Sequence, residues 1–132
     1  MNLVSEQDAE TMNLSCVDAP REVSEIDYAG IATGPATRVA PPLIATAPVS
    51  FECVEREVLE IGPRQVIAVG EILVTHIRDE FIADPAKLHI DTAAMQLIGR
   101  LHGAGTYLRN TDTFTMARPA FDPARVTPGD AR

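Results

Sequence analysis

The sequence predicts a mainly β fold with short helices, of the α+β class, and two observations carry this prediction. First, Val49–Cys53 alternates apolar and polar residues, as a half-buried strand does. Second, Val66–Ile77 is apolar on both parities, which indicates a central strand covered on both faces. Gly62-Pro63 marks a turn between the two segments. We therefore expect one long β-hairpin.

The segment before the hairpin is expected to hold a short helix and a long loop. Residues 5–14 form the helix, with Ser5 as an N-cap whose hydroxyl accepts a bond from a free amide. Asp8 is a weaker form of the capping-box acid. Residues 15–48 follow mainly as loop, since proline and glycine interrupt them repeatedly. A single helical turn is expected within this loop at Glu25–Ala29.

Two irregularities are expected inside the hairpin. The phase of the apolar residues slips at Val54, and a bulge near Cys53–Val54 accounts for the slip. Gly70 is the one glycine of the second strand, and it marks a further bulge or a close approach of two backbones.

Short turns and one more strand are expected after the hairpin. Asp84-Pro85 has the pattern of a cap and first helical position and opens a turn through Leu88, while Asp91 caps a turn that runs to Leu97. The last three features are a glycine-rich loop, a short strand and a flexible tail, at Gly99–Gly105, Thr113–Met116 and residues 120–132.

Length and composition set limits on the class of protein. A chain of 132 residues with 45% hydrophobic residues is expected to form one domain. The net charge of −8 disfavours nucleic-acid binding, because an acidic surface repels phosphates. Cys16 and Cys53 are expected to be reduced thiols. With no signal peptide and no apolar stretch long enough to span a bilayer, we expect a cytoplasmic protein without membrane contact.

Several motifs, taken in order, resemble those of the flavin reductase-like family of FMN-binding split-barrel proteins. The C-terminal pattern of that family is filled here by Gly99, Arg100, Leu101, Gly103, Tyr107, Arg109, Phe114, Arg118 and Pro119. Further matches lie upstream, at Asn2–Ser5 with Met12-Asn13, Tyr28–Ile31, Ala47–Cys53, Val69–Ile72 with His76, and Asp84 with Lys87-Leu88.

The resemblance implies a fold, a cofactor and an activity. The fold would be a partial split β-barrel of the FMN-binding type over residues 1–119. The protein would form a homodimer and act as an NAD(P)H:flavin oxidoreductase, with FMN or alternatively FAD as cofactor and NADH or NADPH as electron donor. Two alternatives stay open: a truncated, non-catalytic remnant, or a flavin-carrying electron-transfer module.

The chain also departs from the family pattern. In that family most flavin contacts come from the half that would precede Met1, and Met1 itself falls where the family has an internal strand residue. This position suggests a misplaced start codon, a gene remnant or an expression fragment. His102 stands where the family has a glycine, which would crowd a close approach to flavin.

Four residues are the expected flavin contacts, with no catalytic residue assigned. His76, following the family's strand histidine, lies near flavin or nicotinamide, or is a hydrogen-bonded core or rim histidine. Tyr107 lies near the flavin ring or closes the barrel, and Gly103 belongs to the loop before it. Arg100, like Arg109, pairs with a phosphate or with an acidic side chain, and the acidic excess favours the second.

Other kinds of site are disfavoured by spacing. The three histidines, His76, His89 and His102, are not spaced as zinc ligands on one element. The serines do not form a Gly-x-Ser-x-Gly motif, and the glycines form neither a dinucleotide fingerprint nor a phosphate-binding P-loop.

Overall fold

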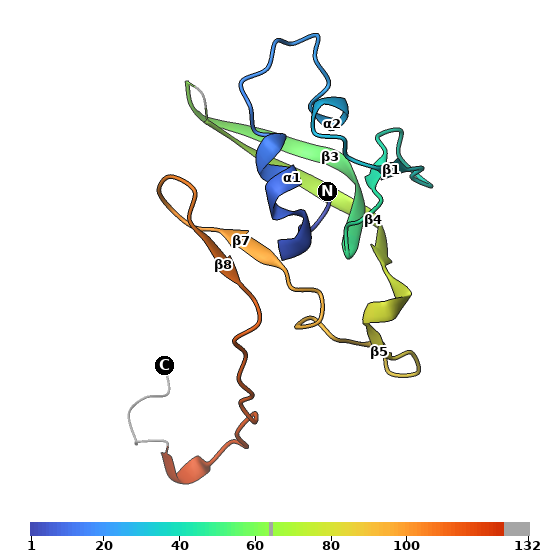
Figure 1. Ribbon diagram of the computed structural model, residues 1–132. Helices are drawn as coiled ribbons and strands as arrows, with labels where there is room; N and C mark the ends of the chain where they lie inside the picture. Colours follow the sequence, from blue (N-terminus) through green and yellow to red (C-terminus); the bar gives the residue numbers. More distant parts are fainter. Residues whose placement is uncertain (64, 126–132) are drawn as a thin grey trace.

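A computed structural model describes residues 1–63 and 65–125 (Figure 1). The dominant element is an antiparallel hairpin of β3 (Val49–Gly62) and β4 (Gln65–Ile77), which confirms the expected hairpin. All other elements are short. The helices are η1 (Glu6–Asp8), α1 (Ala9–Leu14), α2 (Glu25–Tyr28), η2 (Asp79–Phe81) and η3 (Pro123–Arg125). The remaining strands are β1 (Thr33–Gly34), β2 (Leu43–Ile44), β5 (Ile82–Asp84), β6 (His89–Ile90), β7 (Ile98–Arg100) and β8 (Tyr107–Arg109).

The strands pair as four separate antiparallel hairpins: β1 with β2, β3 with β4, β5 with β6, and β7 with β8. Over residues 1–63 and 65–125 they do not close into a barrel. The mainly β class with short helices is thus confirmed. None of the helices in the described part of the chain is long and apolar enough to cross a membrane.

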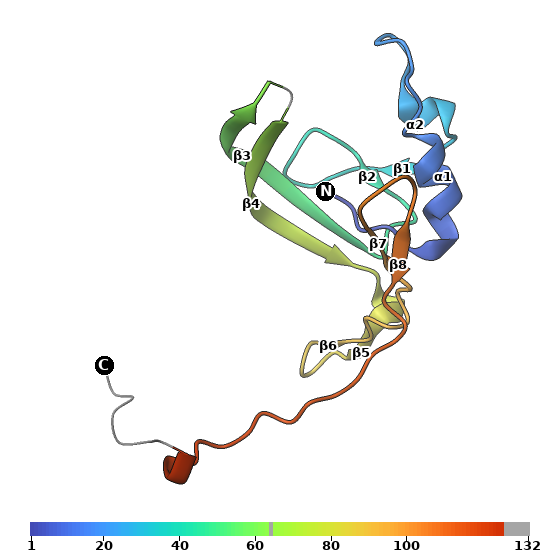
Figure 2. The same cartoon turned by 90° about the vertical axis from the view of Figure 1, so that its left-hand side faces the viewer.

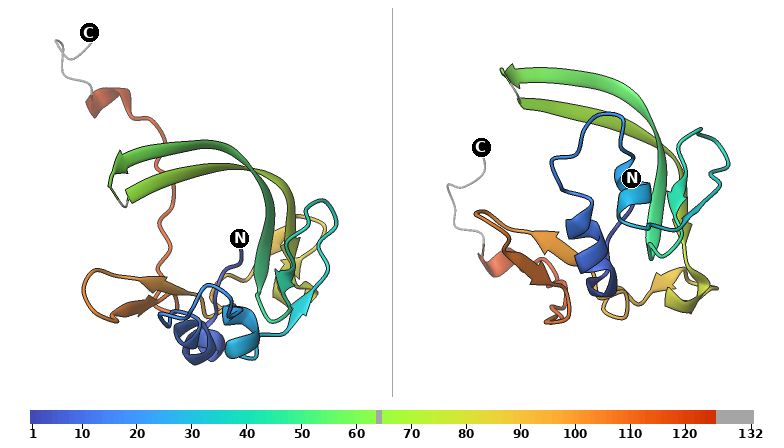
Figure 3. Two further views of the ribbon diagram at one scale, coloured as in Figure 1. Left: turned by 90° about the horizontal axis from the view of Figure 1, so that it is seen from above. Right: turned by 45° about the horizontal axis from the view of Figure 1, so that its top comes forward.

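The N-terminal segment joins two of these hairpins. The amide of Leu3 donates to the carbonyl of Val49 (2.9 Å), and the amide of Phe51 donates to the carbonyl of Met1 (2.7 Å). On the other side, the amide of Ile98 donates to the carbonyl of Val4 (3.0 Å). The long hairpin curves over this segment (Figure 3).

Both expected irregularities of the hairpin are present. The register shifts between Glu52 and Cys53, and it shifts again between Glu55 and Glu57, where Gly70 is the partner of Glu55. A Cβ on Gly70 would lie 3.4 Å from the Cβ of Cys53, a close approach of the two strands. Such shifts increase the local bend and twist of a hairpin.

The expectation that the second strand is covered on both faces is wrong. Val66, Val69 and Ile72 of β4 are 62%, 45% and 50% exposed. Within the described residues β3 is the one strand paired with β4, so the apolar pattern is present but the layers that would cover it are not. The buried apolar residues are instead few and lie at the base of the hairpin and beyond it: Ala47, Val49 and Met95.

The expected helix over residues 5–14 forms as two pieces, η1 and α1. The cap is wrong in its detail, because the hydroxyl of Ser5 donates to the carboxylate of Asp8 (3.1 Å) and accepts no amide. By contrast, α2 confirms the helical turn expected at Glu25–Ala29, and there the hydroxyl of Ser24 accepts from the amide of Asp27 (3.2 Å).

The two aspartate turns are confirmed. The carboxylate of Asp84 accepts from the amides of Ala86 (3.0 Å) and Lys87 (3.3 Å), and that of Asp91 accepts from the amide of Ala94 (2.9 Å). Each carboxylate satisfies amides that the turn leaves free, so the local sequence suffices to specify both turns.

The strand expected at Thr113–Met116 is wrong. This segment is irregular, and its Phe114 and Met116 side chains are exposed. The pairing occurs earlier, at β8, and the chain then leaves the body of the molecule as an extended segment (Figure 2). A β-prone segment becomes a strand only beside a partner, and none pairs with it among the described residues. Residues 126–132 of the expected tail lie outside the described residues.

We expect this chain to self-associate or aggregate in solution, because a long apolar hairpin with free edges offers pairing sites. Replacing Val66 and Ile72 with lysine should reduce the associated fraction severalfold. As a control, lysine at Thr111 and Thr113 adds the same two charges to the irregular C-terminal segment, where both side chains are exposed, and should leave the associated fraction unchanged. Size-exclusion chromatography with light scattering measures the result, and a monomeric unmodified chain contradicts the expectation.

Candidate functional site

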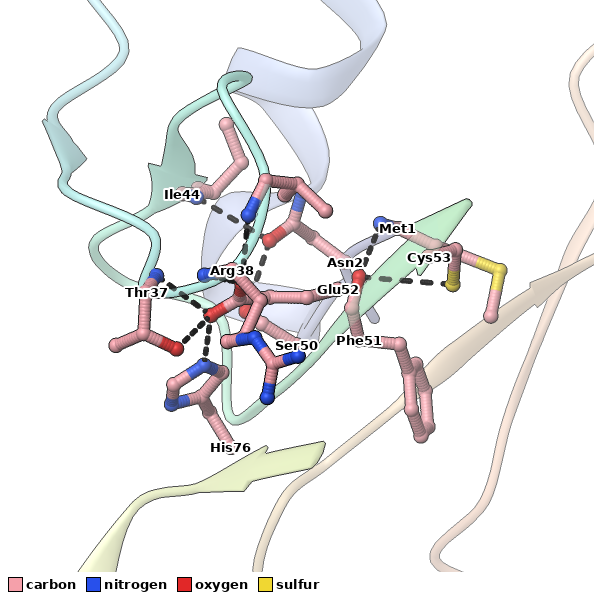
Figure 4. A network of polar contacts seen from close by, with 11 residues as sticks. Met1, Asn2, Thr37, Arg38, Ile44, Ser50, Phe51, Glu52, Cys53 and His76 are labelled. Carbon is pink, nitrogen blue, oxygen red and sulfur yellow. Dashed lines mark hydrogen bonds and ion pairs between the residues drawn. The ribbon is translucent and has the colours of Figure 1, made fainter. Parts of the chain in front are cut away.

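A glutamate with no exposed surface lies at the centre of the densest polar network in the described residues (Figure 4). One carboxylate oxygen of Glu52, Oε1, accepts from the amide and the hydroxyl of Thr37, both at 2.8 Å. The other, Oε2, accepts from the amides of Arg38 (2.5 Å) and Val39 (3.2 Å). The Nε2 atom of His76 lies 2.6 Å from Oε1. Three elements therefore meet at one carboxylate.

The hairpin register brings Glu52 and His76 together. Ser50 pairs with His76 and Glu52 pairs with Val74, so Glu52 and His76 are diagonal neighbours on one face. Diagonal neighbours in an antiparallel pair are within reach when the side chains are long. The third element is the loop between β1 and β2, whose consecutive amides at 37–39 point at the carboxylate. Consecutive amides of this kind form an anion-binding concavity.

The surroundings of Glu52 favour its ionised form. Burial raises the pKa of the carboxyl, but hydrogen bonds from Thr37, His76 and Arg38 outweigh the burial and lower the pKa to about 2. Hydrogen bonds to a carboxylate stabilise the charged form over the neutral one. Glu52 is consequently a buried anion at neutral pH, compensated by backbone dipoles and by the imidazole of His76.

A second polar contact fixes the N-terminal segment beside this network. The side-chain oxygen of Asn2 accepts from the hydroxyl of Ser50 (2.8 Å) and from the amide of Ile44 (3.2 Å). The terminal ammonium of Met1 donates to the carbonyl of Phe51 (2.7 Å). These bonds hold the segment, β2 and the start of β3 in one arrangement.

The other three expected site residues lie together in the β7–β8 hairpin. Arg100 donates to the hydroxyl of Tyr107 (3.1 Å) and to the carbonyls of Gly103 (2.8 Å) and Leu101 (3.2 Å). Its guanidinium lies 5.1 Å from the centre of the Tyr107 ring. Gly103 has φ +82, a left-handed conformation that favours glycine. The structure thus joins Arg100, Gly103 and Tyr107, whereas His76 belongs to the Glu52 network.

The two arginines differ in their partners. Arg109 forms an ion pair with Glu6, as the acidic composition indicates, and the hydrogen bond from Arg109 lowers the pKa of Glu6. For Arg100 the expected acidic partner is wrong, because its described bonds go to two carbonyls and a phenol. Part of the Arg100 guanidinium therefore stays available to a ligand, since five N–H groups serve three such bonds.

Neither of two hollows in the described residues is lined by all four of the expected site residues. A hollow of about 370 Å³ lies between α1, residues 2–4, residues 30–32 and residues 44–47, and it is lined by none of the four. A smaller one of about 150 Å³ is lined in part by Tyr107. No group of three potential metal-ligating side chains occurs over residues 1–63 and 65–125, and both cysteines are free thiols.

Sequence reasoning missed Glu52 and its loop. The alternation of Val49–Cys53 assigns Ser50 and Glu52 to the polar face of the strand, yet both are buried. The available signal was a glutamate and a histidine on neighbouring strands, which a hairpin with this register places on one face. The sequence carried no signal for the role of residues 37–39, because they act mainly through backbone amides, to which Thr37 adds its hydroxyl.

Comparison with other proteins places the fold. No protein-family model matches the chain. An uncharacterised protein of Deinococcus radiodurans is 42% identical over 118 residues, which are 89% of this chain and 52% of that protein. One of Halalkalibacterium halodurans is 30% identical over 130 residues, which are 95% of this chain and 60% of that protein. The chain spans about half to three-fifths of the length of these relatives.

Solved structures extend the comparison. The 2-nitrobenzoate 2-nitroreductase NbaA of Pseudomonas fluorescens has a TM-score of 0.82 at 32% identity, over 96% of this chain and 61% of that one. Nitrilotriacetate monooxygenase component B of Bacillus cereus scores 0.77 at 19% identity, over 87% and 57%. A Shewanella frigidimarina protein assigned as a flavin reductase with a split barrel domain scores 0.76 at 16%, over 90% and 59%. The chain has part of a flavin reductase-like split-barrel fold.

The ionised Glu52 should make stability depend on acid pH. Its pKa is about 2 in the folded chain against an ordinary 4.5, so its contribution is complete above pH 4.5 and is lost as pH falls toward 2. Glu52→Gln should remove most of this dependence and lower the melting temperature at pH 7 by roughly 5 °C or more. Glu57→Gln, at an exposed site on the same strand, is the matched control. Thermal unfolding between pH 2 and 7 measures both. Parallel curves for Glu52→Gln and the unmodified chain contradict the assignment.

Proposed function

We propose that this chain forms part of a flavin reductase-like oxidoreductase that moves a hydride from NADH or NADPH to FMN or FAD. The observation that carries the proposal is the similarity to NbaA, with a TM-score of 0.82 and 32% identity over 96% of this chain. The Shewanella protein shares the fold. NbaA is a 2-nitrobenzoate 2-nitroreductase, and this chain covers 61% of it, so the oxidoreductase activity of this chain is a proposal.

A bound flavin would supply the redox chemistry, as an acceptor of two electrons and of the protons that go with them. The chain supplies groups of the required kind. Arg100 and Tyr107 offer a cation and an aromatic face on one hairpin, beside the positive-φ residue Gly103. A Cβ on Gly103 would meet no atom within 4 Å, so a ligand can approach this backbone. His76 offers a half-exposed imidazole for a flavin carbonyl or for proton exchange.

The donor set fits a flavin, but one copy of the described residues does not enclose it. The four residues lie on two separate hairpins, and neither of the two hollows described above is lined by all four. Flavin sites are concave and bury most of the ligand. We therefore propose that the flavin lies at a surface that a second copy, or the further length present in the relatives, completes.

The same observation favours a second candidate function. Because the four residues lie on two separate hairpins, the second candidate is a non-catalytic domain, or a flavin carrier that lacks its own reductase activity. The reductase and the flavin carrier differ in what happens after flavin binds, because only the reductase also binds the nicotinamide and consumes it, whereas the non-catalytic domain binds no flavin.

A flavin titration followed by NADH tests both candidates. FMN fluorescence is followed as protein is added at micromolar concentrations, and NADH absorbance is then followed with excess FMN. Quenching with NADH loss supports the reductase, whereas quenching alone supports the flavin carrier. Unchanged fluorescence with no NADH loss, for a protein of verified folding, contradicts both flavin functions and leaves the non-catalytic domain.

Within this proposal Arg100 is a flavin contact, and Arg100→Ala should weaken FMN binding by about tenfold, the usual effect of losing a hydrogen bond to a charged group. Tyr107→Phe, which keeps the ring and removes only the hydroxyl bonded to Arg100, should weaken binding less. Arg21→Ala, at an exposed arginine elsewhere in the chain, is the control for the change in charge. Equal FMN affinity in the Arg100 and Arg21 variants rejects the assignment.

A further inference from the structure

We infer that Glu52 is a positioning residue for His76: it holds the imidazole with the proton on Nε2 and presents Nδ1 as the atom that exchanges a proton or hydrogen bond with a ligand. This inference rests on the proposed function and deepens it, because it names the nitrogen that would face the flavin or the nicotinamide. It is carried by the contacts around the carboxylate.

The first step concerns which atom holds the proton. The carboxylate of Glu52 receives two amide bonds and one hydroxyl bond from Thr37 and Arg38, and a longer one from Val39. The amides can act there only as donors, and an ionised carboxylate only accepts, so the hydroxyl of Thr37 donates as well. At 2.6 Å from Oε1, Nε2 of His76 must then donate as well. Its proton is fixed by the network and does not depend on a ligand.

The second step concerns the other nitrogen. In a neutral imidazole with the proton on Nε2, Nδ1 carries the free lone pair and accepts a hydrogen bond; in the charged ring it donates one. Figure 4 shows this second nitrogen turned away from Glu52. The side chain of His76 is 36% exposed, whereas that of Glu52 is fully buried. One nitrogen of the ring therefore contacts a buried anion, and the other nitrogen lies on the side of the ring away from that anion.

The third step concerns the other charged groups near His76 that could determine which ring nitrogen carries the proton. Among the charged groups on the elements around the ring, the structure shows a contact with the ring for Glu52 of β3. The loop between β1 and β2 carries Arg38, whose amide donates to that same carboxylate. The other charged residues of the two strands are Glu55, Arg56, Glu57, Glu60 and Glu71, and of these Arg56 pairs with Glu71. Arg78 follows β4 and pairs with Glu80 (3.1 Å). Glu52 is the acid whose contact with the ring the structure shows. Its own position is fixed by hydrogen bonds from the loop between β1 and β2. The amides of 37–39 thus hold Glu52, and Glu52 holds His76.

The chain with ¹⁵N-labelled histidine, without flavin, provides the direct test. Long-range ¹H–¹⁵N spectra at pH 7 to 9 distinguish the two neutral tautomers of His76, and His76→Gln assigns the signals. We expect at least about nine-tenths of the neutral ring to carry its proton on Nε2, with that proton slow to exchange. A ring protonated mainly on Nδ1 overturns the inference without any variant.

Two variants separate positioning from a structural role. Glu52→Gln should give a mixture of tautomers and a fast-exchanging ring proton, whereas Thr37→Val, which removes one hydroxyl bond to the same carboxylate, should leave the tautomer unchanged. Equal tautomer ratios in the unmodified chain and Glu52→Gln overturn the inference. If Glu52→Gln does not fold, Glu52→Asp replaces it: the shorter carboxylate should lose contact with Nε2 and release the ring, and an unchanged tautomer there also overturns the inference.

Activity distinguishes this inference from the proposed function. If the unmodified chain oxidises NADH in the presence of FMN, Glu52→Gln and His76→Gln should each lower kcat by about tenfold or more, and the double variant should fall no further. Additive losses overturn the positioning role. If the unmodified chain shows neither FMN quenching nor NADH oxidation, the proposed function fails, while the tautomer of His76 is still decided by the spectra.

Discussion

The arrangement at the base of the long hairpin depends on a single buried charge. Glu52 has no exposed surface, and an ion in such a place is tolerated only when donors replace the water it has lost. Those donors come from the loop between β1 and β2 and from His76 of β4. The carboxylate therefore fixes where the loop crosses the hairpin, and with the bonds of Asn2 it fixes the N-terminal segment beside them.

The distal part of the same hairpin is not buried in this way. Beyond the Glu52 network, β3 and β4 expose apolar side chains on both faces, and in the described residues they pair only with each other. The structures that share this fold are longer, and this chain covers 57–61% of them. A surface of this kind suits covering by further protein, and the separation of His76 from the Arg100 cluster agrees with a flavin site that needs such a surface.

Features with a local physical cause were predictable from the sequence. The hairpin, its bulge near Cys53 and the close approach at Gly70 follow from apolar phase and from the missing Cβ of glycine. Asp84 and Asp91 satisfy amides two or three residues away, so their turns need no distant partner. In the candidate site, the proximity of Arg100, Gly103 and Tyr107 could be predicted from the sequence, because a glycine-containing turn reverses the chain between them.

The sequence by itself determined the β-rich class, the long hairpin and the types of residue offered to a ligand, because these depend on periodicity and short-range hydrogen bonds. Tertiary structure alone decided that Glu52 is buried, that β4 is exposed and that the last strand is at Tyr107–Arg109 and not at Thr113–Met116. In each case the deciding partner is distant in sequence or absent from the described residues. Alternation shows that a strand has two faces, but only the neighbouring elements decide which face meets protein and which meets water.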